Sequence, residues 1–220
     1  MNGFGKYFIT LSTLLAIVVF HSDNVIANDA NYKVECVKNM LNTTIKNTEL
    51  KNMSKAKQKQ AVVDAYFPYF DLEWNAKMSI GINYKKMTNQ EQQLYLKEFA
   101  KFFSYVWLPY LYVDNTSGAR LVVKDKTVNV NETDEYVDVV VYMPDGKIFN
   151  IRLRVRDKAG WQHCKILNAI IDGVDLAMSY RAQFDAYIEK NNGRSGSIID
   201  YLLEKNHQYK RESGIILPID

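Results

Sequence analysis

Few side chains in this chain have the types and spacing that catalysis or metal binding requires. Beyond residue 27 the chain contains two histidines, His163 and His207, and two cysteines, Cys36 and Cys164. His163 and Cys164 are adjacent in a segment with strand periodicity, so their side chains would point to opposite faces and would not form a nucleophile–base pair. These four residues also lack the spacing of a zinc site. The sequence therefore predicts no catalytic residue, no metal centre and no cofactor.

Other ligand-binding motifs are equally weak. Segment 193–197 reads GRSGS, which is not the G-x-S-x-G elbow and follows a helical pattern where that motif needs a strand. The formal net charge is +3, and no basic stripe with interleaved aromatic residues occurs. This pattern does not indicate nucleic-acid binding.

Three arginines, Arg152, Arg154 and Arg156, alternate with apolar residues and therefore share one face of a predicted strand. They could keep the solvent face of an antiparallel sheet polar, which is the common arrangement. Alternatively, they form a patch for an acidic partner surface or for lipid headgroups. The sequence leaves both interpretations open.

The first 27 residues have the features of a secretory signal peptide. Lys6 precedes an apolar run over residues 7–20, and residues 25–27, VIA, form a small-residue cleavage site. The run is shorter than the about 20 apolar residues that a transmembrane helix needs. We therefore expect residues 1–27 to be a cleaved signal peptide and residues 28–220 to be an exported, soluble single domain.

Export bears on the two cysteines, because disulfides form in oxidising compartments. A bridge between Cys36 and Cys164 would close a long loop and stabilise the fold by about 4–5 kcal/mol in the chain-entropy model. Two buried thiols that behave as small apolar residues are the alternative. The sequence leaves the disulfide open, because it does not give the distance between the two Cα atoms.

Helical periodicity dominates the region of about 31–113. Asp71 is placed to cap a helix over 72–80, which Gly81 ends. Further on, a capping box of Thr88 and Glu91 opens the longest helix. The broad apolar side of this helix carries Leu94, Phe99, Phe102, Phe103, Val106 and Tyr110.

The region of about 119–171 changes to the alternating pattern of strands. The clearest strand carries Phe149, Ile151, Leu153 and Val155 on one face, which is typical of an antiparallel sheet with one apolar side. Other strands are expected over 121–124, 127–131, 137–143 and 161–171. Helices follow over about 174–210. This order of elements predicts an α+β fold, with helices on one face of a curved antiparallel sheet.

The stretch 169–188 links the sheet to the first of these later helices. Asp172-Gly173 is a turn dipeptide, after which Leu176, Tyr180 and Phe184 recur at helical spacing. One interpretation is a helix that closes the core. The other is that Val174, Leu176 and Tyr180 line an apolar cavity.

Three blocks along the chain resemble those of a known family. They are Tyr69-Phe70-Asp71-Leu72 with Ala76-Lys77-Met78 and Gly81; Thr88, Gln90, Gln93 and Phe99; and Trp161 followed by Asp172-Gly173-Val174 and Tyr180-Arg181-Ala182-Gln183-Phe184. In this order they resemble the MlaC family of periplasmic phospholipid-binding proteins of the toluene-tolerance type. The sequence departs from the family pattern at Asp175, where serine is usual, and in the strand after Trp161, which lacks the usual aspartate.

The resemblance implies a fold and a function together. The fold is an NTF2-like sheet whose helices enclose a deep apolar pocket. The function is that of a monomeric periplasmic phospholipid carrier that is not an enzyme. It would move lipid between an outer-membrane lipoprotein complex and an inner-membrane ABC transporter with a ring-shaped lipid-binding subunit, and so maintain outer-membrane lipid asymmetry. The bound phospholipid is cargo.

The residues expected to line the pocket are apolar and come from the long helix, the sheet and the stretch after it. They are Phe70, Met78, Phe99, Phe103, Val106, Val139, Val141, Ile151, Leu153, Val174, Leu176 and Tyr180. Arg181 is expected near the mouth, at a headgroup or in a structural salt bridge. The alternative function is an NTF2-like enzyme or small-molecule-binding protein, which would need a carboxylate or histidine in the cavity. Asp138 alternates away from the apolar face of its strand, which argues against the enzyme.

Overall fold

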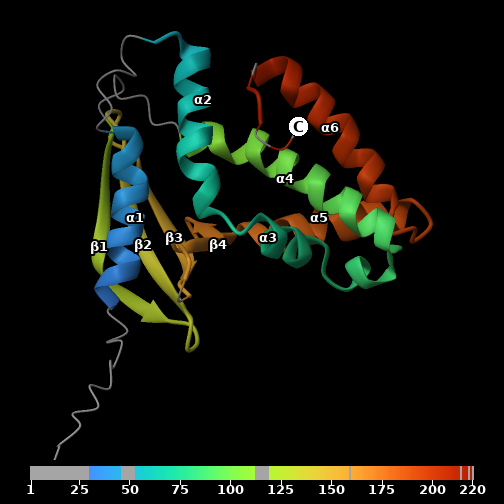
Figure 1. Cartoon of the computed structure of the whole chain (residues 1–220), viewed down its shortest axis with the longest axis horizontal. Coiled ribbons are helices and arrows are strands. Elements are labelled where there is room, and N and C mark those ends of the chain that lie inside the picture. The colour runs from blue at the N-terminus through green and yellow to red at the C-terminus, as the bar shows by residue number, and fades with distance from the viewer. Residues whose placement is uncertain are drawn as a thin grey trace, which may run out of the picture.

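A computed structural model describes residues 30–45, 53–111, 119–158, 160–213, 215–217 and 219 of the chain (Figure 1). The expected signal peptide, residues 1–27, lies outside the described residues. Among the described helices, none is long and apolar enough to cross a membrane. The segments of regular structure follow the predicted order of helices, then strands, then helices.

The first helices are α1 (Ala30–Ile45), α2 (Lys55–Tyr66), the 3-10 turn η2 (Phe67–Tyr69), α3 (Leu72–Ile80), the 3-10 turn η3 (Gly81–Lys86) and α4 (Asn89–Leu111). Among them, α3 and α4 begin where capping residues predict. The Asp71 carboxylate accepts a hydrogen bond from the Trp74 amide at the start of α3. Thr88 and Glu91 form the expected reciprocal capping box at the start of α4.

The sheet is an antiparallel meander in the order β1-β2-β3-β4-β5. The strands are β1 (Arg120–Asn129), β2 (Asp134–Tyr142), β3 (Ile148–Arg156), β4 (Lys165–Ile171) and β5 (Val174–Asp175), followed by α5 (Leu176–Lys190) and α6 (Ser197–Ser213). Two expected boundaries were wrong. The two short strands expected before residue 131 are one strand with a register shift between Val123 and Thr127. The strand expected from Trp161 begins at Lys165, so His163 and Cys164 precede it.

The helices cover one face of the sheet in two groups, and each group forms its own core. Helix α1 lies against the sheet with α2 beside it, whereas α3 to α6 gather beyond the β4 side of the sheet (Figure 1). The sheet core, between α1, α2 and the strands, contains Val34, Val37, Met40, Val62, Val63, Tyr66, Val137, Val139, Leu153, Val155 and Ile166. The C-terminal segment joins it, because Ile215 and Leu217 are buried there.

The helical core lies between α3, α4, α5 and α6 and is largely aromatic. It contains Ala76, Ile80, Tyr95, Phe99, Phe102, Phe103, Phe184, Ile188, Ile198, Ile199 and Leu202. Helix α4 joins the two cores, since Phe99, Phe102 and Phe103 lie in the helical core and Tyr105 lies in the sheet core. This helix continues past Pro109 to Leu111.

A disulfide fastens the first helix to the sheet. Cys36 of α1 and Cys164, which directly precedes β4, are bonded to each other, with their Cα atoms 6.3 Å apart. Both residues are buried within the sheet core. The sequence separation of 128 residues means that the bond encloses most of the helical and sheet regions in one loop.

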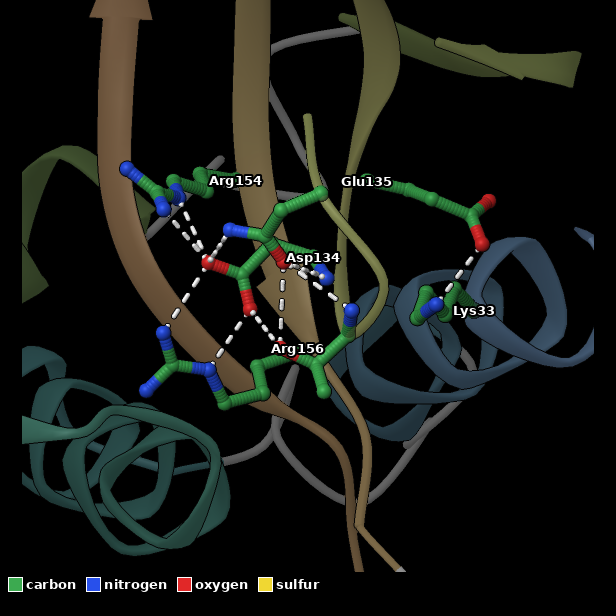
Figure 2. Close-up of polar contacts among 7 residues, drawn as sticks. Lys33, Asp134, Glu135, Arg154 and Arg156 are labelled. Carbon is green, nitrogen blue, oxygen red and sulfur yellow. Dashed lines mark hydrogen bonds and ion pairs between the residues drawn. The ribbon is translucent and has the colours of Figure 1, made fainter. Parts of the chain in front are cut away.

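On the polar face of the sheet, a buried carboxylate lies between two arginines of β3 (Figure 2). The Asp134 side chain is fully buried, and it accepts hydrogen bonds from Arg154 and Arg156 at distances of 2.5–3.0 Å. Burial opposes ionisation of Asp134, but the hydrogen bonds from Arg156 and Arg154 outweigh it and lower the pKa of this carboxyl well below its usual range. Arg154 also lies over the ring of Trp74, which connects β3 to α3.

The third arginine has its own partner. Arg152 donates two hydrogen bonds to Asp138, its cross-strand neighbour on β2. The three arginines therefore form ion pairs with two carboxylates of the same sheet, Asp134 and Asp138.

Removing the disulfide should destabilise the fold without changing its architecture. For a Cys36→Ala/Cys164→Ala variant we expect the free energy of unfolding to fall by about 4–5 kcal/mol, because the unfolded chain regains the entropy of the long loop. Urea denaturation of both proteins, with and without reductant, measures the loss. Reductant should weaken the wild type and leave the variant unchanged; equal stability of the two oxidised proteins would contradict the expectation.

The ion pairs of Asp134 with Arg154 and Arg156 should make the free energy of unfolding depend on pH in acid. Because the folded pKa of Asp134 is depressed, its stabilisation is complete above the unfolded value of about 3.9 and is lost as pH falls toward the folded pKa. We expect Asp134→Asn to cost about 3–5 kcal/mol at pH 7 and to flatten the acid limb of the stability profile. Denaturation with urea between pH 7 and pH 2.5 measures both effects.

The matched control for this variant is Asp138→Asn, which removes a carboxylate from the same face of the same strand. Its ion pair with Arg152 is much more exposed, so the loss should stay within about 1 kcal/mol. Similar losses of unfolding free energy for the two variants would show that the burial of Asp134 does not determine its contribution to stability.

Candidate functional site

An apolar pocket lies at the seam between the sheet core and the helical core. Its volume is about 80 Å³. Strands β3 and β4 form one wall, and α3, α4, α5 and the segment before α3 form the others. The lining residues are Phe70, Asn75, Ser79, Phe103, Ile151, Leu153, Ile166, Asn168, Ala169, Ile171, Leu176, Ala177 and Tyr180.

Strand alternation places the sheet side of the pocket. Ile151 and Leu153 point to the covered face of β3, and their antiparallel partners on β4 are Ile171 and Ala169. Directly opposite residues in an antiparallel pair have side chains on the same face. The four residues therefore form one apolar surface, and Ala169 leaves room at its centre.

The helix side of the pocket depends on how α5 leaves the sheet. Asp172 and Gly173 both have positive φ, which makes the tight turn between β4 and β5. Asp175 then caps α5 by accepting from the Met178 amide. Asn168 of β4 donates to Asp175 and accepts from the Ala177 amide, so the first turn of α5 is fixed to the sheet beside the pocket.

The lining is suited to holding an apolar molecule. Its polar members are Asn75, Ser79, Asn168 and Tyr180, and among the described residues no Asp, Glu, Lys, Arg, His or Cys lines it. Across the part of the chain that the structure describes, no three His, Cys, Asp or Glu residues gather where they could hold a metal ion. The arrangement can therefore enclose hydrocarbon and offer a few neutral hydrogen bonds.

Of the twelve residues that the sequence indicated for the pocket, the structure brings six together around it. These are Phe70, Phe103, Ile151, Leu153, Leu176 and Tyr180. Phe70 occupies the seam itself, because it packs against both cores and forms an isolated bridge to Ile166 of β4.

The other six lie outside the pocket lining. Phe99 packs in the helical core and Val106 packs against it, Val139 lies in the sheet core, and Val141 is buried on β2. The Met78 side chain does not reach the pocket. Val174 is 55% exposed, because it lies in the two-residue edge strand β5.

Sequence reasoning missed seven lining residues: Asn75, Ser79, Ile166, Asn168, Ala169, Ile171 and Ala177. A signal existed for two of them. Ala169 and Ile171 alternate along β4 and would have been found by extending the strand pattern into a pairing with β3. Asn75 and Ser79 gave no such signal, because polar helix residues are ordinarily solvent-facing.

Arg181 has a structural contact at the end of α3. Its Nε donates to the Met78 carbonyl at 3.0 Å, and its guanidinium lies against Gly81. A Cβ at Gly81, whose φ is +58°, would come within 2.9 Å of the guanidinium carbon. The positive charge thus satisfies a carbonyl at the C-terminal end of α3, where the helix dipole favours a cation.

Fold and site together define a class: α+β proteins in which helices cover one face of an antiparallel meander and leave an apolar pocket against it. The chain belongs to the MlaC protein family, whose pattern matches residues 35–204. Among solved structures it is similar to the phospholipid-binding protein from Ralstonia solanacearum, determined in complex with a phospholipid at 1.53 Å. The two share 22% identity and a TM-score of 0.64, over 82% of this chain and 98% of that one. No curated protein sequence matches this chain.

Replacing Arg181 should loosen the packing of α3 against α5. We expect Arg181→Ala to lower the free energy of unfolding by about 2 kcal/mol, since a hydrogen bond from a charged group at a helix end is lost. Chemical denaturation measures it, with Gln183→Ala, an exposed position on the same helix, as the control. Unchanged stability in Arg181→Ala would mean that this contact does not hold α3.

Proposed function

We propose that this protein is a periplasmic phospholipid carrier, which holds acyl chains in the pocket between β3, β4, α3, α4 and α5. The observation that carries the proposal is the apolar pocket at the seam in a chain of the MlaC family. The related structure from Ralstonia solanacearum, which contains a phospholipid, supports the same ligand class. Neither bound metal nor cofactor takes part.

The energetics of the cargo explain why a pocket is needed. Moving an acyl chain of about 16 carbons out of water is worth about 13 kcal/mol, at about 0.8 kcal/mol per methylene. A lipid therefore crosses an aqueous compartment only inside an apolar enclosure. Exchange with a bilayer replaces one apolar surrounding by another, so loading and release can be nearly neutral and partner proteins can set their direction.

The pocket must enlarge to admit such a chain. Its volume of about 80 Å³ is well below the about 300–1,000 Å³ that is usual for pockets enclosing small organic ligands. The seam offers a way to open, because α3 and α5 belong to the helical core and β3 belongs to the sheet core. Movement of α3 and α5 away from β3 and β4 enlarges the pocket, while α4, which contributes to both cores, keeps them connected.

The proposed setting is the space between two membranes. The signal-peptide pattern in residues 1–27 and the disulfide agree with export to an oxidising compartment. There the protein would act as a monomer. It would carry phospholipid between an outer-membrane lipoprotein complex and an inner-membrane ABC transporter with a ring-shaped lipid-binding subunit, and so maintain outer-membrane lipid asymmetry.

An NTF2-like enzyme is the alternative that we do not propose. Its chemistry would need a carboxylate or histidine in the pocket, and the lining offers none. Asp138, the nearest carboxylate by sequence pattern, is paired with Arg152 on the polar face of the sheet.

Protein purified from the periplasm should contain phospholipid. We expect organic extraction and mass spectrometry to recover phospholipid in a fixed ratio to protein, close to one molecule per chain. A periplasmic protein without an apolar pocket, purified in parallel, measures background lipid. Recovery no higher than this background would contradict the proposed function.

A charge in the pocket should abolish this occupancy. We expect Leu176→Glu to reduce the recovered lipid at least tenfold, because an unpaired carboxylate beside the acyl chain is costly to bury. The variant should fold, since a carboxylate in the first turn of α5 favours the helix dipole. Val174→Glu is the matched control, since this residue lies two positions earlier and is exposed. Equal occupancy in the two variants would show that Leu176 does not contact lipid.

A further inference from the structure

Helix α3 presents a short polar strip inside the otherwise apolar pocket. Asn75 and Ser79 are four residues apart, so they lie on the same face of the helix, and both line the pocket. Only 4% of the Asn75 surface and 1% of the Ser79 surface is exposed. Both side chains therefore face the pocket, with almost no access to solvent.

The hydrogen-bonding capacity of this strip is largely unused within the described residues. Asn75 donates once, from Nδ2 to the Asp71 carbonyl at 2.8 Å, and its Oδ1 accepts no hydrogen bond from them. Ser79 makes no side-chain hydrogen bond to them, and neither Asn75 Oδ1 nor Ser79 Oγ is fully enclosed by protein atoms. A buried polar group without a partner is unfavourable, and most such groups in folded proteins are paired.

Another buried serine shows that a serine hydroxyl can form its hydrogen bond within its own helix. Ser104 in α4 is also 1% exposed, and its hydroxyl donates to the Ala100 carbonyl at 2.8 Å. Serines in helices commonly bond to the carbonyl four residues earlier. Ser79 does not do so, and its hydroxyl remains available to a molecule in the pocket. Asn168, also in the lining, is by contrast bonded to Asp175 and Ala177.

We infer that Asn75 and Ser79 bind the glycerol-ester carbonyl of the lipid, an inference that rests on the proposed function. An acyl chain offers no hydrogen-bonding atom along its length, and the ester carbonyl is where a diacyl lipid first offers an acceptor. The Ser79 hydroxyl donates to that oxygen, and the second N–H of the Asn75 amide can add another hydrogen bond. The strip thus selects ester-linked lipids over ether-linked lipids with the same chains and headgroup.

The test is a competition between two lipids that differ only at the linkage. The mature, disulfide-bonded protein is delipidated and incubated with vesicles that contain equal amounts of dipalmitoyl phosphatidylglycerol and its dihexadecyl ether analogue. After separation from the vesicles, mass spectrometry gives the ratio of the two lipids on the protein. One neutral hydrogen bond predicts an enrichment of the ester lipid by about two- to tenfold in the wild type.

Two variants identify the source of any enrichment. Ser79→Ala should fold, because alanine favours the helix, and should bring the ratio close to one while still binding both lipids. Ser104→Ala, which removes a buried hydroxyl outside the pocket lining, should keep the wild-type ratio. A ratio of one in the wild type, or an unchanged enrichment in Ser79→Ala, would overturn the inference and leave the carrier function standing. Failure of the wild type to take up either lipid would overturn both.

Discussion

The covered face of one antiparallel sheet is the constraint on which the rest of the structure depends. On that face β2 carries Val137, Val139 and Val141 and β3 carries Phe149, Ile151, Leu153 and Val155, and apolar area of this kind must be removed from water. Helices α1 and α2 cover one part with dense packing. Helices α3 to α5 cover the other part through an aromatic core of their own, and the pocket lies where these two coverings meet.

The two coverings are fixed to the sheet by different means. On the α1 side, the disulfide joins Cys36 to Cys164, and the buried ion pair of Lys33 with Glu135 lies under the same helix (Figure 2). On the other side the ties include the hydrogen bonds of Asn168 with Asp175 and the Ala177 amide and the contact of Arg154 with Trp74. Because these contacts are not covalent, whereas the α1 side is closed by a disulfide, we expect the seam to open more easily than the α1 side.

The parts of this structure that local chemistry determines could be predicted from the sequence. The start of α3 at Asp71 and the capping box at Thr88 depend on neighbours within four residues, and the α+β order follows from the change of hydrophobic period. The boundary of β4 could not be predicted in this way. The apolar pattern continues back to Trp161, but Trp161 donates to the Lys158 carbonyl in a turn, and Cys164 is fixed by a partner 128 residues away.

The pocket residues, too, were predictable where local pattern placed them and unpredictable where tertiary packing did. Alternation on β3 placed Ile151 and Leu153 correctly on the covered face, yet the list of expected lining residues also included Val174, which is exposed on the edge strand β5. Asn75, Ser79 and Ala169 were missed because a pocket is defined by what its lining leaves unfilled or unpaired. Small and polar residues contribute those properties, whereas hydrophobic pattern analysis gives weight to large apolar residues.

A narrow seam also resolves a difficulty that faces any carrier of lipid in water. A wide, open apolar pocket would expose a large hydrophobic patch between deliveries, and such patches promote association. In this fold the pocket has a volume of only about 80 Å³, so it holds little open apolar surface. For the proposed carrier, the acyl chain then replaces contacts between α5 and β4 by contacts with itself. The free energy of opening is set by a few edge hydrogen bonds and by apolar area that the cargo covers again.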